Sequence, residues 1–290
     1  MSRAQHLPAI APADHVPHPL HHEERTWPES NCYVDLWIEV LHALGLDPHA
    51  CLPFTLGLDF EGDQWTFGKP ALAELYDLYG IDVQELSLWR SLDQQVAEQV
   101  GRGRLVLPEV DSFFLPDTRG TDYKTQHGKT TIAIAEIDVA GQQLGYFHNG
   151  GYYQLAGADF AGLLRVGEEP PGALPPYVEF AKLDRLQRRP QRELVVMAVE
   201  LVRRYLSRLP QHNPLRRFAE RFAEHLDWLF VGSASFHAYA FVTLRQLGYH
   251  AKPVGLLNAF GFYDHLIAFL DQAMSHGLCN ARVQIGRAHV

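Results

Sequence analysis

Residues 130–137 read TTIAIAEI and residues 143–155 read QLGYFHNGGYYQL, and these two segments decide the fold class. Both are rich in β-branched and aromatic residues, and Gly141 marks a turn between them, so they predict neighbouring strands. Residues 105–110 (LVLPEV) have the same character and predict a further strand. The sequence therefore predicts an antiparallel sheet in the middle of the chain.

Helical periodicity precedes and follows these strands. From Cys32 to Leu44, apolar residues recur at steps of three and four, which predicts a helix that begins at Cys32. The same reasoning predicts further helices at residues 70–79, 92–100, 192–209, 214–229 and 235–247. We therefore expect an α+β domain at residues 29–166, a linker rich in Pro and Gly at 167–176, and a helical region at 177–284.

The two ends of the chain depart from this pattern. Residues 1–28 hold five histidines among Pro and Ala without an apolar period. They predict an irregular, solvated arm, with a metal-binding tract as the alternative. Residues 285–290 (IGRAHV) match what one frame of a common sequencing adapter encodes, so we expect an artefact there and a truncated C-terminus.

Composition limits the classes of function. The chain has 290 residues, of which 47% are hydrophobic, and this suits a folded core. Its 25 Lys and Arg against 34 Asp and Glu give a net charge of −9, which argues against nucleic acid or an anionic membrane as the main partner. The sequence shows neither an apolar run of ~18 residues nor a secretory signal pattern, so we expect a cytoplasmic protein.

Cys32 is the most informative of three cysteines, whose unrelated spacings predict neither a disulfide framework nor a structural zinc site. It lies in the first turn of a predicted helix, where the helix dipole and unpaired backbone N–H groups favour the thiolate. This placement suits a nucleophile. The alternative is a small buried hydrophobic residue.

Two later residues strengthen the first interpretation. His127 leads into the strand at 130–137, and Asn149 ends the strand that returns after Gly141. In this chain order the three residues suggest acyl-transfer chemistry: Cys32 attacks a carbonyl carbon, His127 holds the proton, and Asn149 orients the imidazole ring. Taken alone, His127 would suit a loop histidine without a catalytic role.

These motifs resemble a known family. The segments SNCY at 30–33, VLPEVDSFFLP at 106–116 and YFHN at 146–149 are similar to papain-like cysteine enzymes, nearest to the N-terminal domain of the butirosin-biosynthesis acyltransferase. Over roughly residues 29–247, the chain is identified as a member of the bacterial domain-of-unknown-function 1839 family, whose genes tend to lie beside amino acid:carrier-protein ligases. The resemblance implies a papain-like (cysteine peptidase-like) fold for the α+β domain.

The resemblance also implies roles for single residues. Cys32 matches the nucleophile, His127 matches the base, and Asn149 stands where relatives often carry Asp. His148 is an alternative orienting group, and Asp111 is a second candidate for orienting or for contact with substrate.

The oxyanion donors are less well defined. The Gln that relatives place before the nucleophile is missing, because Thr26 stands six residues before Cys32. The backbone N–H of Cys32 and the side chain of Asn31 are therefore the candidates for stabilising a tetrahedral intermediate.

We expect a thiol-dependent acyltransferase that moves an acyl or aminoacyl group from a carrier-protein thioester to an amine or hydroxyl acceptor through acyl-Cys32. This chemistry needs no metal, and the phosphopantetheine arm of the carrier is part of the donor rather than a bound cofactor. A papain-like cysteine peptidase or amidase, and a catalytically inactive papain-like binding module, remain alternatives.

Arginines gather in the predicted helical region. Ten lie between residues 185 and 221, against two glutamates before Glu220. Because carrier proteins present an acidic helix to their enzymes, we hypothesise that this face docks the carrier, with Arg203 and Arg204 as candidates. The alternative is a solvated helix face. The expected partners are thus a carrier protein and a small-molecule acceptor.

Overall fold

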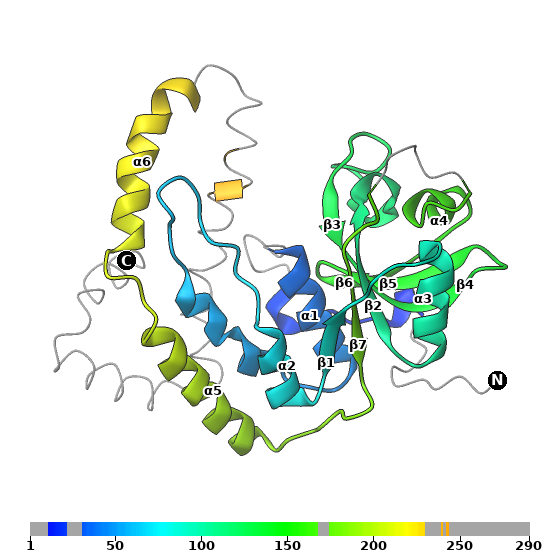
Figure 1. The fold of residues 1–290 in the computed structure, drawn as a ribbon, viewed down its shortest axis with the longest axis horizontal. Helices are drawn as coiled ribbons and strands as arrows, with labels where there is room; N and C mark the ends of the chain where they lie inside the picture. The colour runs from blue at the N-terminus through cyan, green and yellow to red at the C-terminus, as the bar shows by residue number, and fades with distance from the viewer. Residues whose placement is uncertain (1–10, 22–30, 168–173, 230–238, 240–241, 244–290) are drawn as a thin grey trace. The chain divides into compact units, whose positions relative to one another are not determined.

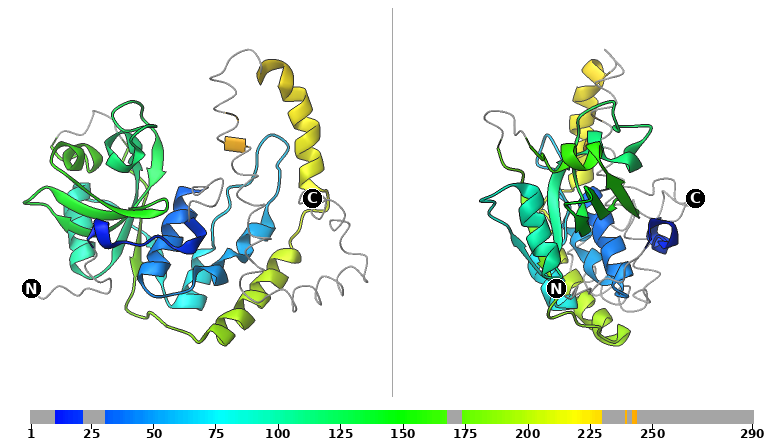
Figure 2. Two further views of the ribbon diagram at one scale, coloured as in Figure 1. Left: turned by 180° about the vertical axis from the view of Figure 1, so that it is seen from behind. Right: turned by 90° about the vertical axis from the view of Figure 1, so that its right-hand side faces the viewer.

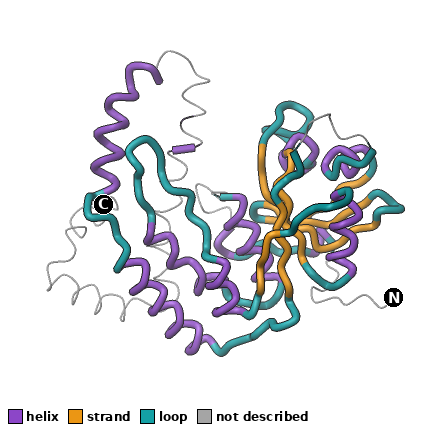
Figure 3. Tube along the Cα trace, viewed as in Figure 1, coloured by secondary structure: helices purple, strands orange, loops and turns teal. Residues whose placement is uncertain are grey.

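The computed structural model describes residues 11–21, 31–167, 174–229, 239, 242 and 243. The chain forms two compact units, Met1–Pro48 with Pro70–Arg189, and His49–Lys69 with Pro190–Val290. Figure 1 labels the helices and strands, and Figure 3 distinguishes them by colour. Most of the predicted linker at 167–176 and of the predicted helix at 235–247, and all of residues 285–290, lie outside the described residues.

The first unit contains a seven-stranded sheet whose strands pair antiparallel. Six strands run in the order β1-β7-β2-β4-β5-β6, and β3 pairs with β2. The strands are β1 Asp82–Glu85, β2 Leu105–Asp111, β3 Lys129–Thr131, β4 Ala133–Asp138, β5 Gln143–His148, β6 Gly151–Ala156 and β7 Val178–Lys182. The prediction of an α+β fold with an antiparallel sheet is confirmed.

Strand β7 corrects one expectation from the sequence, which placed the start of the helical region at residue 177. Val178–Lys182 instead extend between β1 and β2 in the middle of the sheet. The strand is short and follows Pro175 and Pro176, so the local pattern resembles a linker. Long-range pairing with β1 and β2, rather than local periodicity, makes this segment a strand.

One face of the sheet carries a large apolar core, and we call it the α3 face. Helices α3 (Leu92–Gly101) and α4 (Ala158–Leu163) pack on it. Because side chains alternate between the two faces of a strand, residues on one face of β2, β4, β5, β6 and β7 contribute to this core. Its members include Leu92, Val96, Val106, Val110, Ile134, Tyr146, Phe160 and Val178.

The opposite face carries helix α1 (Cys32–Ala43), and we call it the α1 face. The helix packs against β3, β5 and β6. The hydroxyl of Tyr33 donates to Oε2 of Glu179 at 2.6 Å, and Glu179 alternates with the core residue Val178 on β7. Figures 1 and 2 show α1 and α3 on opposite sides of the sheet.

The segment before α1 corrects a second expectation, that of a solvated arm. Residues Pro12–Asp14 and Pro19–His21 form short helical turns, and His18, Leu20 and His21 are buried. The segment is held by Glu39 of α1, which accepts the backbone N–H of His18 at 3.0 Å. The sequence pattern misses this because one buried carboxylate, rather than an apolar stripe, fixes the segment.

The remaining helices are α2 (Leu72–Tyr79) in the first unit, and α5 (Gln191–Leu206) and α6 (Pro214–Leu229) in the second. Residues Pro48–Gly57 form a run of tight helical turns. Phe60, Trp65 and Phe218 pack together in the second unit. The predicted helices near the C-terminus are confirmed over α5 and α6. Within the described residues, no helix has the length and apolarity that crossing a membrane requires.

Candidate functional site

Cys32 is the first residue of α1, as the sequence predicts. Its thiol is free and partly exposed. A residue at this position keeps a backbone N–H that has no acceptor within the helix, and it lies at the positive end of the helix dipole. The position therefore suits both a thiolate and a donor to an oxyanion.

Asn31 caps this helix. Its side-chain Oδ1 accepts the backbone N–H groups of Tyr33 at 3.1 Å and Val34 at 3.4 Å. Its own backbone N–H donates to Oδ2 of Asp35 at 3.0 Å. The sequence predicts Asn31 as an oxyanion donor, and because Oδ1 accepts the cap bonds, its NH₂ group is the part that would take this role.

His127 lies in the loop before β3, and Asp111 at the end of β2 holds its ring. Nδ1 of His127 lies 2.5 Å from Oδ2 of Asp111, and the imidazole stacks on Phe113 with a centroid separation of 4.5 Å. The other oxygen of Asp111 accepts the backbone N–H groups of Phe113 at 3.1 Å and Gly128 at 3.3 Å. Nε2 of His127 is thus the nitrogen available for proton transfer, and the side chain is 71% exposed.

Alternation along β2 places Asp111 on the same face of the sheet as α1. Val110 belongs to the core of the α3 face, so its neighbours Glu109 and Asp111 project to the α1 face. The helix that begins at Cys32 and the pair formed by Asp111 and His127 therefore share one face.

Asn149 does not hold the ring of His127 in this arrangement. It lies in the two-residue connection between β5 and β6, where His148 pairs with Gly151, and its backbone φ is +46°. Asn tolerates this left-handed conformation better than most residues. Among the described residues, the group that holds the His127 ring is Asp111.

His148, the alternative orienting residue, faces the other way. Its Nδ1 lies 2.5 Å from Oδ2 of Asp117, and its Nε2 lies 2.8 Å from the hydroxyl of Thr130. Tyr146, two residues earlier on β5, belongs to the α3-face core and donates to Oδ1 of Asp117 at 2.5 Å. Burial, followed by the charge of Asp117, raises the pKa of Tyr146. This network is buried on the side of the sheet away from α1.

A second buried network surrounds Glu179, the second residue of β7. Glu179 accepts hydroxyl hydrogens from Tyr33 at 2.6 Å and from Tyr177 at 2.9 Å. Burial and the bond to Glu179 raise the pKa of Tyr177 to about 12, and burial raises that of Tyr33 further. Both hydroxyls therefore remain protonated donors, and the bond from Tyr33 attaches the first turn of α1 to β7.

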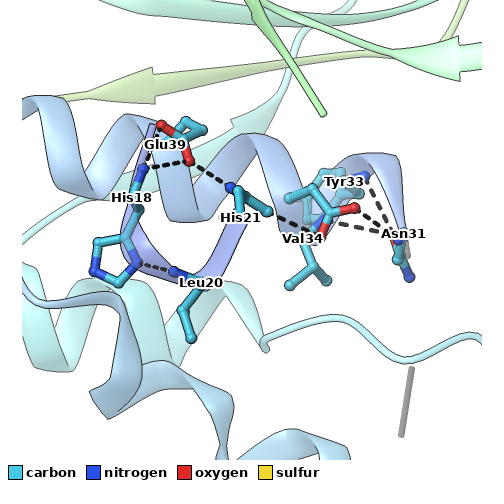
Figure 4. Close-up of polar contacts among 8 residues, drawn as sticks. His18, Leu20, His21, Asn31, Tyr33, Val34 and Glu39 are labelled. Carbon is cyan, nitrogen blue, oxygen red and sulfur yellow. Dashed lines mark hydrogen bonds and ion pairs between the residues drawn. The ribbon is translucent and has the colours of Figure 1, made fainter. Parts of the chain in front are cut away.

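Sequence reasoning misses a cluster of charged groups on α1 itself. Figure 4 shows the ring of His21 directed at Glu39, whereas His18 meets Glu39 through its backbone N–H and turns its ring toward Leu20. Nδ1 of His21 bonds Oε1 of Glu39, and Nε2 of His15 lies 2.8 Å from Oε2. Nε2 of His21 also lies 3.5 Å from Oδ1 of Asp35. Two signals could have found the cluster: the three-residue spacing of these histidines, and two carboxylates four residues apart in an apolar helix.

The charge states in this cluster follow from pairing. Burial works to lower the pKa of His21, but the neighbouring carboxylates of Asp35 and Glu39 outweigh burial and raise that pKa to about 9. Burial works to raise the pKa of Glu39, but its bonds to His15 and His21 lower it to about 2. His21 and Glu39 are thus an ion pair at neutral pH. In the described part of the chain, no group of three or more His, Cys, Asp or Glu side chains is placed to hold a metal ion.

The arginines fall into two groups. Arg188 donates to the carbonyl of Leu44 at 3.0 Å, and Arg189 donates to the carbonyl of Leu78 at 3.1 Å, so both bind the ends of helices in their own unit. Arg203 and Arg204 lie in the last turn of α5 and are exposed, with Arg203 bonded to Glu200. Arg203 and Arg204 therefore present charge at the surface of the second unit, as do the exposed Arg192 and Arg208.

Short stretches of the chain match curated plant enzymes. A cytokinin riboside 5'-monophosphate phosphoribohydrolase of Arabidopsis thaliana is 52% identical over 40 residues, which is 14% of this chain and 19% of that protein. A probable enzyme of the same name from Oryza sativa subsp. japonica is 66% identical over 36 residues, 12% of this chain and 16% of that protein. The chain thus spans less than a fifth of the length of these relatives.

Two family models cover most of the chain. The DUF1839 N-terminal domain matches residues 16–183, and the DUF1839 C-terminal domain matches residues 191–277. The first match ends directly after β7, and the second begins where α5 begins. The chain therefore belongs to the DUF1839 family.

Proposed function

We propose that the protein is a thiol-dependent acyltransferase with a papain-like catalytic unit, in which Cys32 is the nucleophile, His127 the general acid and base, and Asp111 the orienting residue. The observation that carries the proposal is the shared face: α1 begins with a partly exposed thiol on the side of the sheet where Asp111 fixes the His127 ring.

The first half of the reaction loads the thiol. The Cys32 thiolate attacks the carbonyl carbon of a carrier-protein thioester, and the tetrahedral oxyanion is stabilised by the Cys32 backbone N–H and the NH₂ group of Asn31. The C–S bond to pantetheine then breaks. The departing thiolate takes a proton from the imidazolium of His127, which leaves acyl-Cys32 and a free pantetheine thiol.

The second half transfers the group. An amine or hydroxyl acceptor attacks acyl-Cys32 while neutral His127 accepts its proton, and the Cys32 thiolate leaves. Asp111 keeps Nδ1 of the ring engaged, so that Nε2 exchanges protons in both halves. With a peptide or amide as donor and water as acceptor, the same steps would make the protein a peptidase or amidase, with His127 protonating the departing amine.

Surface charge is the observation that supports a carrier protein as the partner. Arg203 and Arg204 are exposed at the end of α5, where they could meet the acidic helix of a carrier protein in the cytoplasm. The surface is suited to steering an acidic partner and does not by itself identify one.

Intact-mass measurement after incubation with aminoacyl-loaded carrier proteins tests the proposal. We expect a mass increase equal to the acyl group in the wild-type protein, mapped to Cys32 and absent from Cys32→Ser. The acyl-loading rate of His127→Asn should be lower than that of the wild-type protein by about 100-fold or more. Addition of amine acceptors should then discharge the adduct as amide. Discharge only as free acid would favour a hydrolase, and an unmodified Cys32 with every donor would contradict both activities.

A further inference from the structure

We propose that His21 is a positioning residue for the Cys32 thiolate, acting through Asp35 and Asn31 at the start of α1. The inference rests on the proposed function, in which Cys32 is the nucleophile. It explains why a buried histidine from a segment outside the sheet is paired with carboxylates on the nucleophile helix.

The imidazole of His21 is enclosed from two sides. Toward α1, Nδ1 bonds Glu39, and Nε2 lies 3.5 Å from Oδ1 of Asp35. On another side lies the β5–β6 connection, where a Cβ added to Gly150 would come within 3.0 Å of Cγ of His21. The side chain of His21 is 3% exposed, so its position is fixed by its neighbours.

Asp35 links this ring to the nucleophile. One carboxylate oxygen faces His21, and the other accepts the backbone N–H of Asn31 at 3.0 Å. Asn31 in turn caps the backbone N–H groups of Tyr33 and Val34. Cys32 lies between these bonded residues in the chain, so the orientation of Asp35 determines the backbone around the thiol.

Charge supplies the second part of the argument. Residues three apart on a helix are neighbours, and a negative charge beside a thiol opposes its ionisation, so in this proposal the charge of Asp35 acts on Cys32. A cationic His21 opposes this effect. The carboxylates of Asp35 and Glu39 outweigh burial and hold the pKa of His21 at about 9, so it is charged at neutral pH.

The other groups around His21 do not replace its charge at Asp35. Glu39 is a full turn further from Cys32 and also pairs with His15. His18 meets Glu39 through its backbone N–H. The β5–β6 connection meets the ring with Gly150, which carries no charge. Among these residues, His21 is the cation placed at Asp35.

The test measures the rate at which iodoacetamide alkylates Cys32 as a function of pH, read at the Cys32 peptide by mass spectrometry. His21→Gln should move the midpoint of this profile upward by roughly 0.5–1 pH unit, because the positive charge of His21 beside Asp35 is removed. The double variant His21→Gln with Asp35→Asn should bring the midpoint back toward that of the wild type. A purely structural role would change the folded fraction without this shift and rescue.

His15→Gln is the matched control, because it also removes a histidine bond to Glu39 but does not approach Asp35. It should leave the midpoint unchanged. An equal shift in His15→Gln, or an unshifted midpoint in folded His21→Gln, would overturn the proposal. If His21→Gln does not fold, Asp35→Asn alone decides: its midpoint should fall, and an unchanged midpoint contradicts the inference.

Alkylation does not require acyl transfer, so the two proposals can fail separately. A shifted midpoint in a protein that never forms acyl-Cys32 would retain the positioning role of His21 and reject the acyltransferase. Acyl transfer with an unshifted midpoint would do the reverse.

Discussion

The carboxylate of Asp111 lies 2.5 Å from Nδ1 of His127, and Asp111 projects from the face of the sheet on which α1 packs. Two backbone N–H groups hold the other oxygen of this carboxylate, so the acidic group is fixed before it meets the ring. The pair has the geometry by which an acid sets the tautomer of a catalytic histidine. The group that orients His127 thus comes from the end of strand β2, and not from Asn149 in the turn between β5 and β6.

Substitutions of Asp111 and of Asn149 should therefore affect the rate of acyl loading differently. Asp111→Asn should slow acyl loading of Cys32 by about 100-fold or more, because the amide can hold the ring in the wrong tautomer. Asn149→Gly should leave the loading rate unchanged, since Gly adopts a φ near +46° without strain. Single-turnover loading with an aminoacyl carrier measures both rates. A large loss in Asn149→Gly with normal activity in Asp111→Asn would restore the assignment made from the sequence.

The network around His148 should contribute to stability and not to chemistry. Tyr146→Phe removes one of the groups that satisfy the buried carboxylate of Asp117, so the free energy of unfolding should fall by roughly 1–3 kcal/mol. Urea unfolding measures this loss. The alkylation rate of Cys32 should be the same in the folded variant, because the network lies on the α3 face. A lower alkylation rate of Cys32 in Tyr146→Phe, with an unchanged free energy of unfolding, would instead place His148 in the catalytic site.

The sequence predicts the elements better than it predicts their partners. Local periodicity indicates the helix that begins at Cys32, and β-branched alternation indicates β2, β4 and β5, because these signals depend on neighbours a few residues apart. It also identifies His127 and Asp111 as candidates. It does not assign Asp111 to His127, because that pairing depends on which face of β2 the side chain occupies.

Local spacing hints at the histidines and carboxylates of the buried cluster but does not assign their pairing. Glu39 reads as an ordinary helix residue, and His21 reads as part of a solvated arm. Only the packed structure shows that each removes the other's penalty for burial. The same holds for Glu179, whose two tyrosine partners lie in distant segments.

The pair formed by His21 and Glu39 predicts how stability depends on pH. The pKa of His21 is raised from 6.5 to about 9, so its contribution is complete below pH 6.5 and is lost as the pH rises through 9. The pKa of Glu39 is lowered from 4.5 to about 2, so its contribution is complete above pH 4.5 and is lost as the pH falls through 2.

Urea unfolding at pH 6 and pH 9.5 checks the alkaline side. The wild-type protein should lose at most roughly 3 kcal/mol of unfolding free energy between these values, and His21→Gln should lose clearly less. His212→Gln, at an exposed position on the second unit, is the control and should behave as the wild type does. An equal pH dependence in His21→Gln and the wild type would show that His21 is not the titrating group.

Charge reversal on α5 tests the partner. Arg203→Glu with Arg204→Glu should weaken the binding of an acidic carrier protein by about 10-fold or more at low salt, and the difference should shrink as salt is added, because exposed charges are screened. These side chains also lie at the negative end of the α5 dipole, so some helix stability should be lost as well.

Arg192→Glu, at the exposed opposite end of the same helix, serves as the comparison and should bind with nearly wild-type affinity. Titration calorimetry at two salt concentrations, together with thermal unfolding, separates these effects. If Arg192→Glu weakens binding as much as the double variant, the partner responds to net charge and not to the end of α5.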